Sequence, residues 1–143
     1  MKKPILVVLA AGVGSRFGGL KQMAPFGLHG EGIIDYSLFD AIQAGFERVI
    51  FIINNKIKDD FINFIGKNME KRMEVSYVYQ ELSKVPSGFK IPSERTKPLG
   101  TGHALLCCKG VIDAPFCVIN GDDLYGRDAY KKIFGFISEE HKA

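Results

Sequence analysis

The length, composition and charge of the chain exclude several classes of protein. Its 143 residues, 46% hydrophobic and 24% charged, are enough for one globular domain with a buried core. The net charge of +3 is small, and no basic run or interleaving of basic with aromatic residues is present, so we expect no nucleic-acid partner. No segment approaches the roughly 20 apolar residues of a membrane span, so we expect no membrane partner and a cytoplasmic location with reduced, buried cysteines.

Strand-like and helix-like segments alternate along the chain. Short apolar or β-branched runs predict strands, and apolar residues spaced three and four apart predict helices. The expected strands are residues 5–11, 48–54, 74–80 and 115–120, and the expected helices are residues 33–44, 58–72, 100–109 and 128–140. This alternation implies an α/β fold with a doubly wound, mostly parallel sheet and right-handed crossovers, in which ligands bind beyond the carboxyl ends of the strands.

A glycine-rich stretch, residues 9–22, spans the end of the first expected strand and the loop after it. Its four glycines let the backbone take positive φ and lie close to a ligand, and exposed N–H groups in such a loop bind anions. Arg16 and Lys21 add two positive charges to the same stretch. The stretch therefore predicts a binding site for a polyphosphate.

Two well-known glycine-rich loops do not fit these residues. A dinucleotide-binding fingerprint requires a third glycine where this chain has Phe17, and an acidic residue where the second expected strand ends in Asn54 and Asn55. A Walker loop requires a lysine where this chain has Leu20. Both readings are excluded by the residues themselves.

A third pattern fits. The order Leu-Ala-Ala-Gly-x-Gly-Ser-Arg from Leu9, followed by a lysine, resembles the signature of the nucleotidyltransferases that activate sugar phosphates. Three further blocks follow in the family's order: Tyr79-Gln80, residues 100–104 and residues 120–123. The resemblance implies a Rossmann-like, GT-A-like core, with residues 1–143 as the nucleotide-binding part of a single nucleotidyltransferase domain. Members of this family normally continue further, so we expect the acceptor-binding half and a second metal-binding aspartate to be missing from this chain.

The resemblance also implies roles for individual residues. Arg16 would neutralise charge that develops on the phosphates, and Lys21 would bind the α-phosphate or the incoming phosphate. Asp122 would be the carboxylate ligand of Mg²⁺, although Asn-Gly-Asp-Asp is also good turn chemistry. These three are the expected catalytic residues. The expected nucleotide-binding residues are Leu9, Ala10, Ala11, Gly12, Gly14, Ser15, Arg16, Lys21, Gln80, Gly100 and Thr101.

Some of these assignments have alternatives on sequence grounds. Gln80 offers both a donor and an acceptor and can read a base edge. Thr101 can instead be a helix cap, and His103 can either contact the substrate or be structural. Cys107 and Cys108 are expected to be core packing.

The sequence therefore predicts an enzyme. We expect a Mg²⁺-dependent nucleotidyltransferase that moves a nucleoside monophosphate from a nucleoside triphosphate to a sugar 1-phosphate and releases pyrophosphate. Two alternatives remain open: a CTP-dependent cytidylyltransferase that acts on a phosphorylated alcohol, and a nucleotide-binding or regulatory module without turnover. The expected partners are a nucleoside triphosphate and a phosphorylated small-molecule acceptor. The base, the acceptor and the oligomeric state are not predicted.

Overall fold

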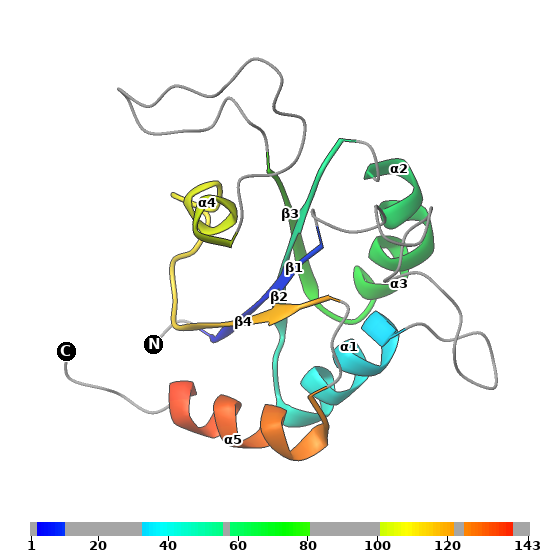
Figure 1. Ribbon diagram of the computed structural model, residues 1–143. Helices are drawn as coiled ribbons and strands as arrows, with labels where there is room; N and C mark the ends of the chain where they lie inside the picture. Colours follow the sequence, from blue (N-terminus) through cyan, green and yellow to red (C-terminus); the bar gives the residue numbers. More distant parts are fainter. Residues whose placement is uncertain (1–2, 11–32, 56–57, 81–100, 122–124, 139–143) are drawn as a thin grey trace.

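The computed structural model describes residues 3–10, 33–55, 58–80, 101–121 and 125–138, and at its centre lies a parallel β-sheet. In the described part of the chain the sheet has four strands, and every pair of neighbours is parallel. They are β1 (Ile5–Leu9), β2 (Arg48–Ile53), β3 (Glu74–Tyr79) and β4 (Phe116–Asn120) (Figure 1). The predicted parallel α/β sheet is therefore confirmed.

The order of the strands in the sheet is β3-β2-β1-β4. The chain thus builds outward from β1 through β2 to β3, and then returns to place β4 on the other side of β1. The direction of winding reverses between β1 and β4, and in open α/β sheets such a reversal creates a crevice at the carboxyl ends of the two strands. Leu9 and Asn120 are paired residues at those ends.

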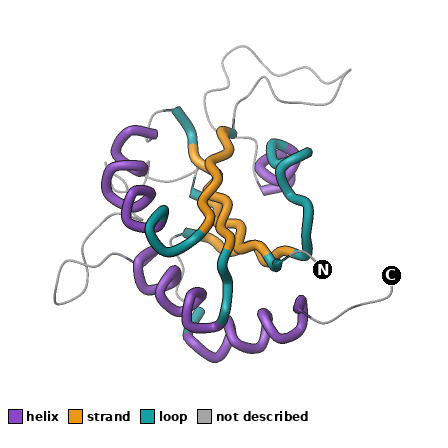
Figure 2. Tube along the Cα trace, turned by 180° about the vertical axis from the view of Figure 1, so that it is seen from behind, coloured by secondary structure: helices purple, strands orange, loops and turns teal. Residues whose placement is uncertain are grey.

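Helices cover both faces of the sheet, because successive side chains of a buried strand point to opposite sides. On one face Leu6 and Val8 of β1 pack with residues of four helical segments. These segments are α1 (Ile33–Ala44), α2 (Lys58–Phe61) with the π-helix η2 (Ile62–Gly66), α3 (Lys67–Met69) and α5 (Arg127–Ser138). On the other face Ile5 and Val7 pack with α4 (Thr101–Leu106), as Figures 1 and 2 show. The sheet is doubly wound, as predicted.

The expected continuous helix over residues 58–72 is wrong in detail. The structure contains a π turn at Ile62–Gly66, where the Lys67 N–H donates to the Ile62 carbonyl, and the helix ends at Met69. Gly66 faces the Tyr77 hydroxyl so closely that a Cβ atom there would lie 2.0 Å from the oxygen. The wider turn is thus adapted to a side chain of β3, which helical periodicity in the sequence does not report.

The expected helix over residues 100–109 also ends earlier. After Leu106 the backbone changes to i→i+3 bonds, from Cys108 N–H to the Leu105 carbonyl and from Lys109 N–H to the Leu106 carbonyl. Gly110 then takes a φ of 86°, a left-handed conformation that ends helices and favours glycine.

The cysteines are free thiols in the structure, and Cys108 is buried in the core beneath α4. Cys107 and Cys117 are only half-buried, so the expectation of fully buried thiols holds for one of the three. Within the described residues, no helix combines the length and the hydropathy that crossing a membrane requires.

Candidate functional site

Two segments with predicted functional residues leave the sheet from neighbouring strands. The Ala10 N–H donates to the Ile52 carbonyl at 2.9 Å, which holds the end of β1 against β2. The Gly121 N–H donates to the Leu9 carbonyl at 2.9 Å, which holds the end of β4 against β1. The glycine-rich stretch continues directly after Ala10, and Asp122 follows Gly121. Both segments therefore begin at the carboxyl edge of the sheet, at the reversal between β1 and β4, where ligands bind in this class of fold.

A third predicted residue, Gln80, lies at the same edge. Its backbone N–H donates to the Ile53 carbonyl at 2.8 Å and so extends the pairing of β3 with β2 by one residue. Its side-chain Nε2 lies 3.1 Å from Nδ1 of His103 in the first turn of α4. Two of the sequence blocks that carry the family resemblance, Tyr79-Gln80 and residues 100–104, are thus joined by a side-chain hydrogen bond.

His103 is enclosed by this contact and by its own helix. The residue is only 8% exposed, and its Nε2 lies 3.9 Å from the Cys107 sulfur one turn further along α4. Next to it Ala104 packs into the core, which holds α4 on the sheet. The structure thus shows His103 buried and in contact with Gln80, a predicted base-reading residue, whereas a contact of His103 with the substrate stays a prediction. Polar side chains at the end of one expected strand and the start of one expected helix were the only sequence signal for this pair.

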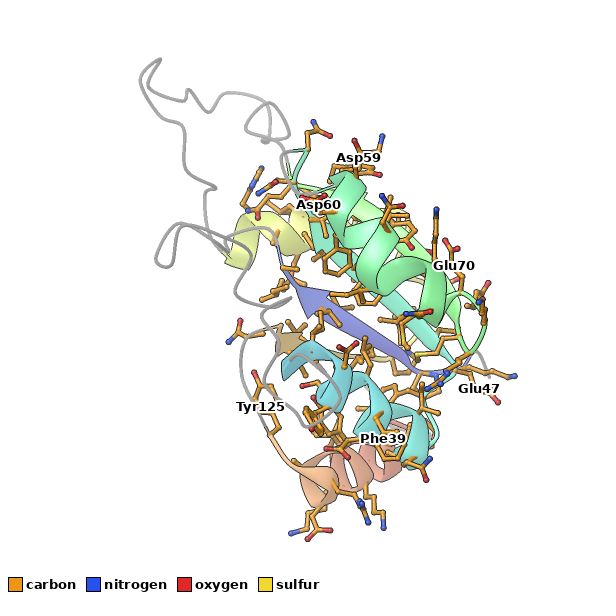
Figure 3. All side chains as sticks on the ribbon, turned by 90° about the vertical axis from the view of Figure 1, so that its right-hand side faces the viewer. Phe39, Glu47, Asp59, Asp60, Glu70 and Tyr125 are labelled. Atoms are coloured by element: carbon orange, nitrogen blue, oxygen red, sulfur yellow. The ribbon has the colours of Figure 1, made fainter. Side chains whose placement is uncertain are left out.

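A tyrosine that the sequence did not single out, Tyr125, contacts the end of β4. The backbone N–H of Asn120 donates to the hydroxyl of Tyr125 at 3.0 Å, and Figure 3 shows the Tyr125 side chain beside the end of β4. The Tyr125 ring makes an edge contact with Tyr130, with the ring centroids 6.2 Å apart. Tyr130 is buried between α1 and α5, and its burial raises its pKa to about 12. These contacts therefore hold Asn120 and Tyr125, described residues on the two sides of residues 122–124.

Most of the predicted site lies outside the described residues. Leu9, Ala10 and Gln80 are placed as above, and Thr101 begins α4, although its side chain is not described. The predicted site residues outside the described part are Ala11, Gly12, Gly14, Ser15, Arg16, Lys21, Gly100 and Asp122. Among residues that the structure describes, no group of three or more His, Cys, Asp or Glu side chains could hold a metal ion. The predicted magnesium ligand, Asp122, falls outside that set.

The curated proteins that this chain resembles include two that are named as nucleotidyltransferases. The uridylyltransferase YngB of Bacillus subtilis, which is named for UTP and glucose 1-phosphate, is 30% identical over 130 residues, or 82% of this chain and 43% of YngB. The low-salt glycan biosynthesis nucleotidyltransferase Agl11 of Haloferax volcanii is 26% identical over 143 residues, or 96% of this chain and 35% of Agl11.

Comparison with solved structures also finds an enzyme that is named for a nucleotide sugar. A UDP-glucose pyrophosphorylase solved with UDP-glucose superimposes with a TM-score of 0.63 and 25% identity, over 97% of this chain and 54% of the other. The chain thus spans between 35% and 54% of the length of these three relatives. The sequence profile of the nucleotidyl transferase family matches residues 5–143. Because that match covers nearly the whole chain, the protein belongs to the nucleotidyl transferase family.

Proposed function

We propose that the protein transfers a nucleoside monophosphate from a nucleoside triphosphate to a sugar 1-phosphate. The observation that carries this proposal is the meeting of β1 and β4 at their carboxyl ends, where the Gly121 N–H bonds to the Leu9 carbonyl. The stretch that is predicted to bind a polyphosphate continues the chain after β1, and the predicted metal ligand Asp122 follows Gly121 in the sequence. The names of the relatives support the substrate class, since YngB is named for glucose 1-phosphate and UTP. We also propose that residues 1–143 form the nucleotide-binding part of a single domain.

The proposed reaction needs no protein nucleophile. A phosphate oxygen of the acceptor attacks the α-phosphorus of the triphosphate and forms the new P–O bond. The bond from the α-phosphorus to the bridging oxygen breaks, and pyrophosphate leaves with the electron pair. Catalysis of such a step rests on holding the attacking oxygen in line and on neutralising charge.

Three side chains would supply the charge. Arg16 would bind the pyrophosphate and the developing charge, and Lys21 would reduce the repulsion between the α-phosphate and the acceptor phosphate. Asp122 would hold Mg²⁺, which accepts one or two carboxylates together with phosphate oxygens and supplies further positive charge when bound. The order of the chain supports this role, because Asp122 follows Gly121, whose N–H bonds to the Leu9 carbonyl at the carboxyl end of β1.

The base would lie toward β3 and α4. Gln80 ends β3 at the same edge of the sheet, and Gly100 and Thr101 precede and begin α4. We propose that these residues contact the base, while the residues after β1 contact the phosphates. The nucleotide would then extend across the carboxyl ends of β1, β2 and β3.

Isothermal titration of the protein with ATP, CTP, GTP, UTP and dTTP, with and without MgCl₂, tests the proposal. We expect at least one triphosphate to bind, and to bind more tightly with Mg²⁺. Release of pyrophosphate is then measured with that triphosphate and glucose 1-phosphate, and in parallel with phosphocholine as the acceptor. Binding of no triphosphate would contradict the proposal, and turnover with phosphocholine alone would favour the cytidylyltransferase.

A further inference from the structure

We infer that His103 is a positioning residue that sets the orientation of the Gln80 side-chain amide, and with it the base that the site accepts. This inference rests on the proposed function, because it assumes that Gln80 faces a nucleobase. It assigns to His103 no contact with the substrate. Its effect would pass through Gln80 alone.

The donor and acceptor roles follow from the two contacts of the His103 ring. The Nε2 atom of Gln80 carries hydrogens and can only donate, so Nδ1 of His103, 3.1 Å away, accepts. The ring proton is then on Nε2 of His103, which faces the Cys107 sulfur at 3.9 Å. The two contacts form one consistent chain, from the amide to the imidazole and from the imidazole to the thiol.

The backbone on each side of this contact is already held. Gln80 is held by the bond from its N–H to the Ile53 carbonyl. α4 is held on the sheet by Ala104 and Cys108, which are 3% and 1% exposed. Because both backbones are held, the contact between Nδ1 of His103 and Nε2 of Gln80 acts on the rotation of the Gln80 side chain.

The orientation of the amide matters because a half-turn exchanges its oxygen and its nitrogen. Each base edge presents donors and acceptors in a fixed order, so a reversed amide offers the opposite pattern. With Nε2 directed at His103, Oε1 is fixed on the other side of the amide. A Gln80 held in this way matches one order of base groups, whereas a Gln80 that can reverse matches both.

Substitution at position 103 separates positioning from a merely structural role. His103→Leu removes the acceptor and replaces the imidazole with an apolar side chain of similar bulk. His103→Asn places an amide oxygen near the position of Nδ1. Leu106→Ala is the matched control, because Leu106 lies on the same helix and is 52% exposed. Thermal denaturation of each variant establishes that it is folded. Titrations use the triphosphate that wild type binds best, the other triphosphates, and inorganic tripolyphosphate, which has no base.

We expect His103→Leu to raise the Kd of the preferred triphosphate about fivefold, which is the change in Kd that the loss of one ordinary hydrogen bond produces. The preference over the other triphosphates should narrow, and the Kd of tripolyphosphate should stay within about twofold. His103→Asn should restore most of the preference, and Leu106→Ala should behave as wild type.

The inference is overturned if His103→Leu binds the preferred triphosphate as wild type does. It is also overturned if the binding of tripolyphosphate weakens in parallel, because the effect would then be structural. In both cases wild type still binds a triphosphate and the proposed function stands. Failure of wild type to bind any triphosphate would instead remove the proposed function, and the inference with it.

Discussion

Gly66 and Tyr77 show how a contact between two residues determines the shape of a helix. The Tyr77 hydroxyl donates to a carboxylate oxygen of Glu70 at 3.1 Å and at the same time lies against Gly66. Burial of Tyr77, reinforced by the bond to Glu70, raises the pKa of the hydroxyl to about 12. Only a residue without a side chain leaves room for this hydroxyl, so the position of Tyr77 requires a glycine in the π turn.

Replacing Gly66 with alanine should therefore destabilise the protein. The new Cβ would lie 2.0 Å from the Tyr77 oxygen and 2.9 Å from its ring carbon Cζ, so the ring or the helix must move. We expect a loss of about 1–3 kcal/mol in the free energy of unfolding, measured by urea denaturation. Gly135→Ala in α5 is the control, because nothing lies within 4 Å of its Cβ position, and it should gain about 0.5–1 kcal/mol. Equal effects at the two positions would contradict the interpretation.

The predicted phosphate-binding cations give a second prediction for single residues. Arg16→Ala and Lys21→Ala should each lower the rate of pyrophosphate release about a hundredfold or more, since each removes a positive charge from the transition state. The melting temperature should change little. Lys132→Ala, an exposed position of α5, is the control and should keep the wild-type rate. Near-normal transfer by either loop variant would show that its assigned role is wrong.

The contact between His103 and Gln80 could not be predicted from the sequence. The sequence predicted Gln80 as a base-reading residue and left His103 open, because the two are 23 residues apart and only the packing of α4 brings them together. Tyr125 was missed as well, since only the structure shows that its hydroxyl lies 3.0 Å from the backbone nitrogen of Asn120. The roles of Arg16, Lys21 and Asp122 stay predictions.

Among the secondary-structure elements, strands were predicted better than the ends of helices. The runs that became β1 and β2 are so apolar or β-branched that burial in a sheet follows from composition alone. β3 is less buried, and its alternation of polar and apolar residues predicted it. The interruption at Gly66 and the early end of α4 depend on neighbouring side chains and on turn geometry, which periodicity does not contain.

Arg48 connects the amino ends of several strands through ion pairs and a hydrogen bond. From the start of β2, its guanidinium reaches Glu74 of β3 at 3.1 Å and Asp113 before β4 at 2.8 Å. It also donates to the carbonyl of Lys3 before β1 at 3.5 Å. The Arg48 side chain is 21% exposed, whereas those of Glu74 and Asp113 are 71% and 42% exposed, so only the Arg48 end of each ion pair is shielded from solvent.

Arg48→Ala should consequently cost more than the loss of an exposed ion pair. We expect a decrease of about 1–2 kcal/mol in the free energy of unfolding, reduced at high salt. Lys3→Ala breaks the ion pair between Lys3 and Glu47, in which the two side chains are 67% and 59% exposed. It should lower the free energy of unfolding by about 0.5 kcal/mol or less. If the two variants unfold at the same urea concentration, Arg48 does not act as a connection between strands.

For the whole molecule, the buried phenols predict how stability responds to alkaline pH. Burial raises the pKa of Tyr130 from 10.0 to about 12, so the folded protein holds this proton more tightly than the unfolded chain does. Its contribution to stability is complete below pH 10 and is lost as the pH rises toward about 12. Urea denaturation across this range should show that decline, and Tyr130→Phe should show a smaller one. If the free energy of unfolding of Tyr130→Phe falls as steeply with pH as that of wild type, Tyr130 is not the group responsible for the decline.

The place of β1 in the sheet has a consequence for local opening of the structure. β1 is bonded to strands on both sides, whereas among the described residues β3 is bonded to β2 alone. Amide hydrogens of the two inner strands, β1 and β2, should therefore exchange with deuterium later than those of β3, because outer strands open at lower free energy. The triphosphate end of a bound nucleotide would then rest on a slowly opening inner strand, while the end that discriminates between bases rests on an outer strand that can adjust.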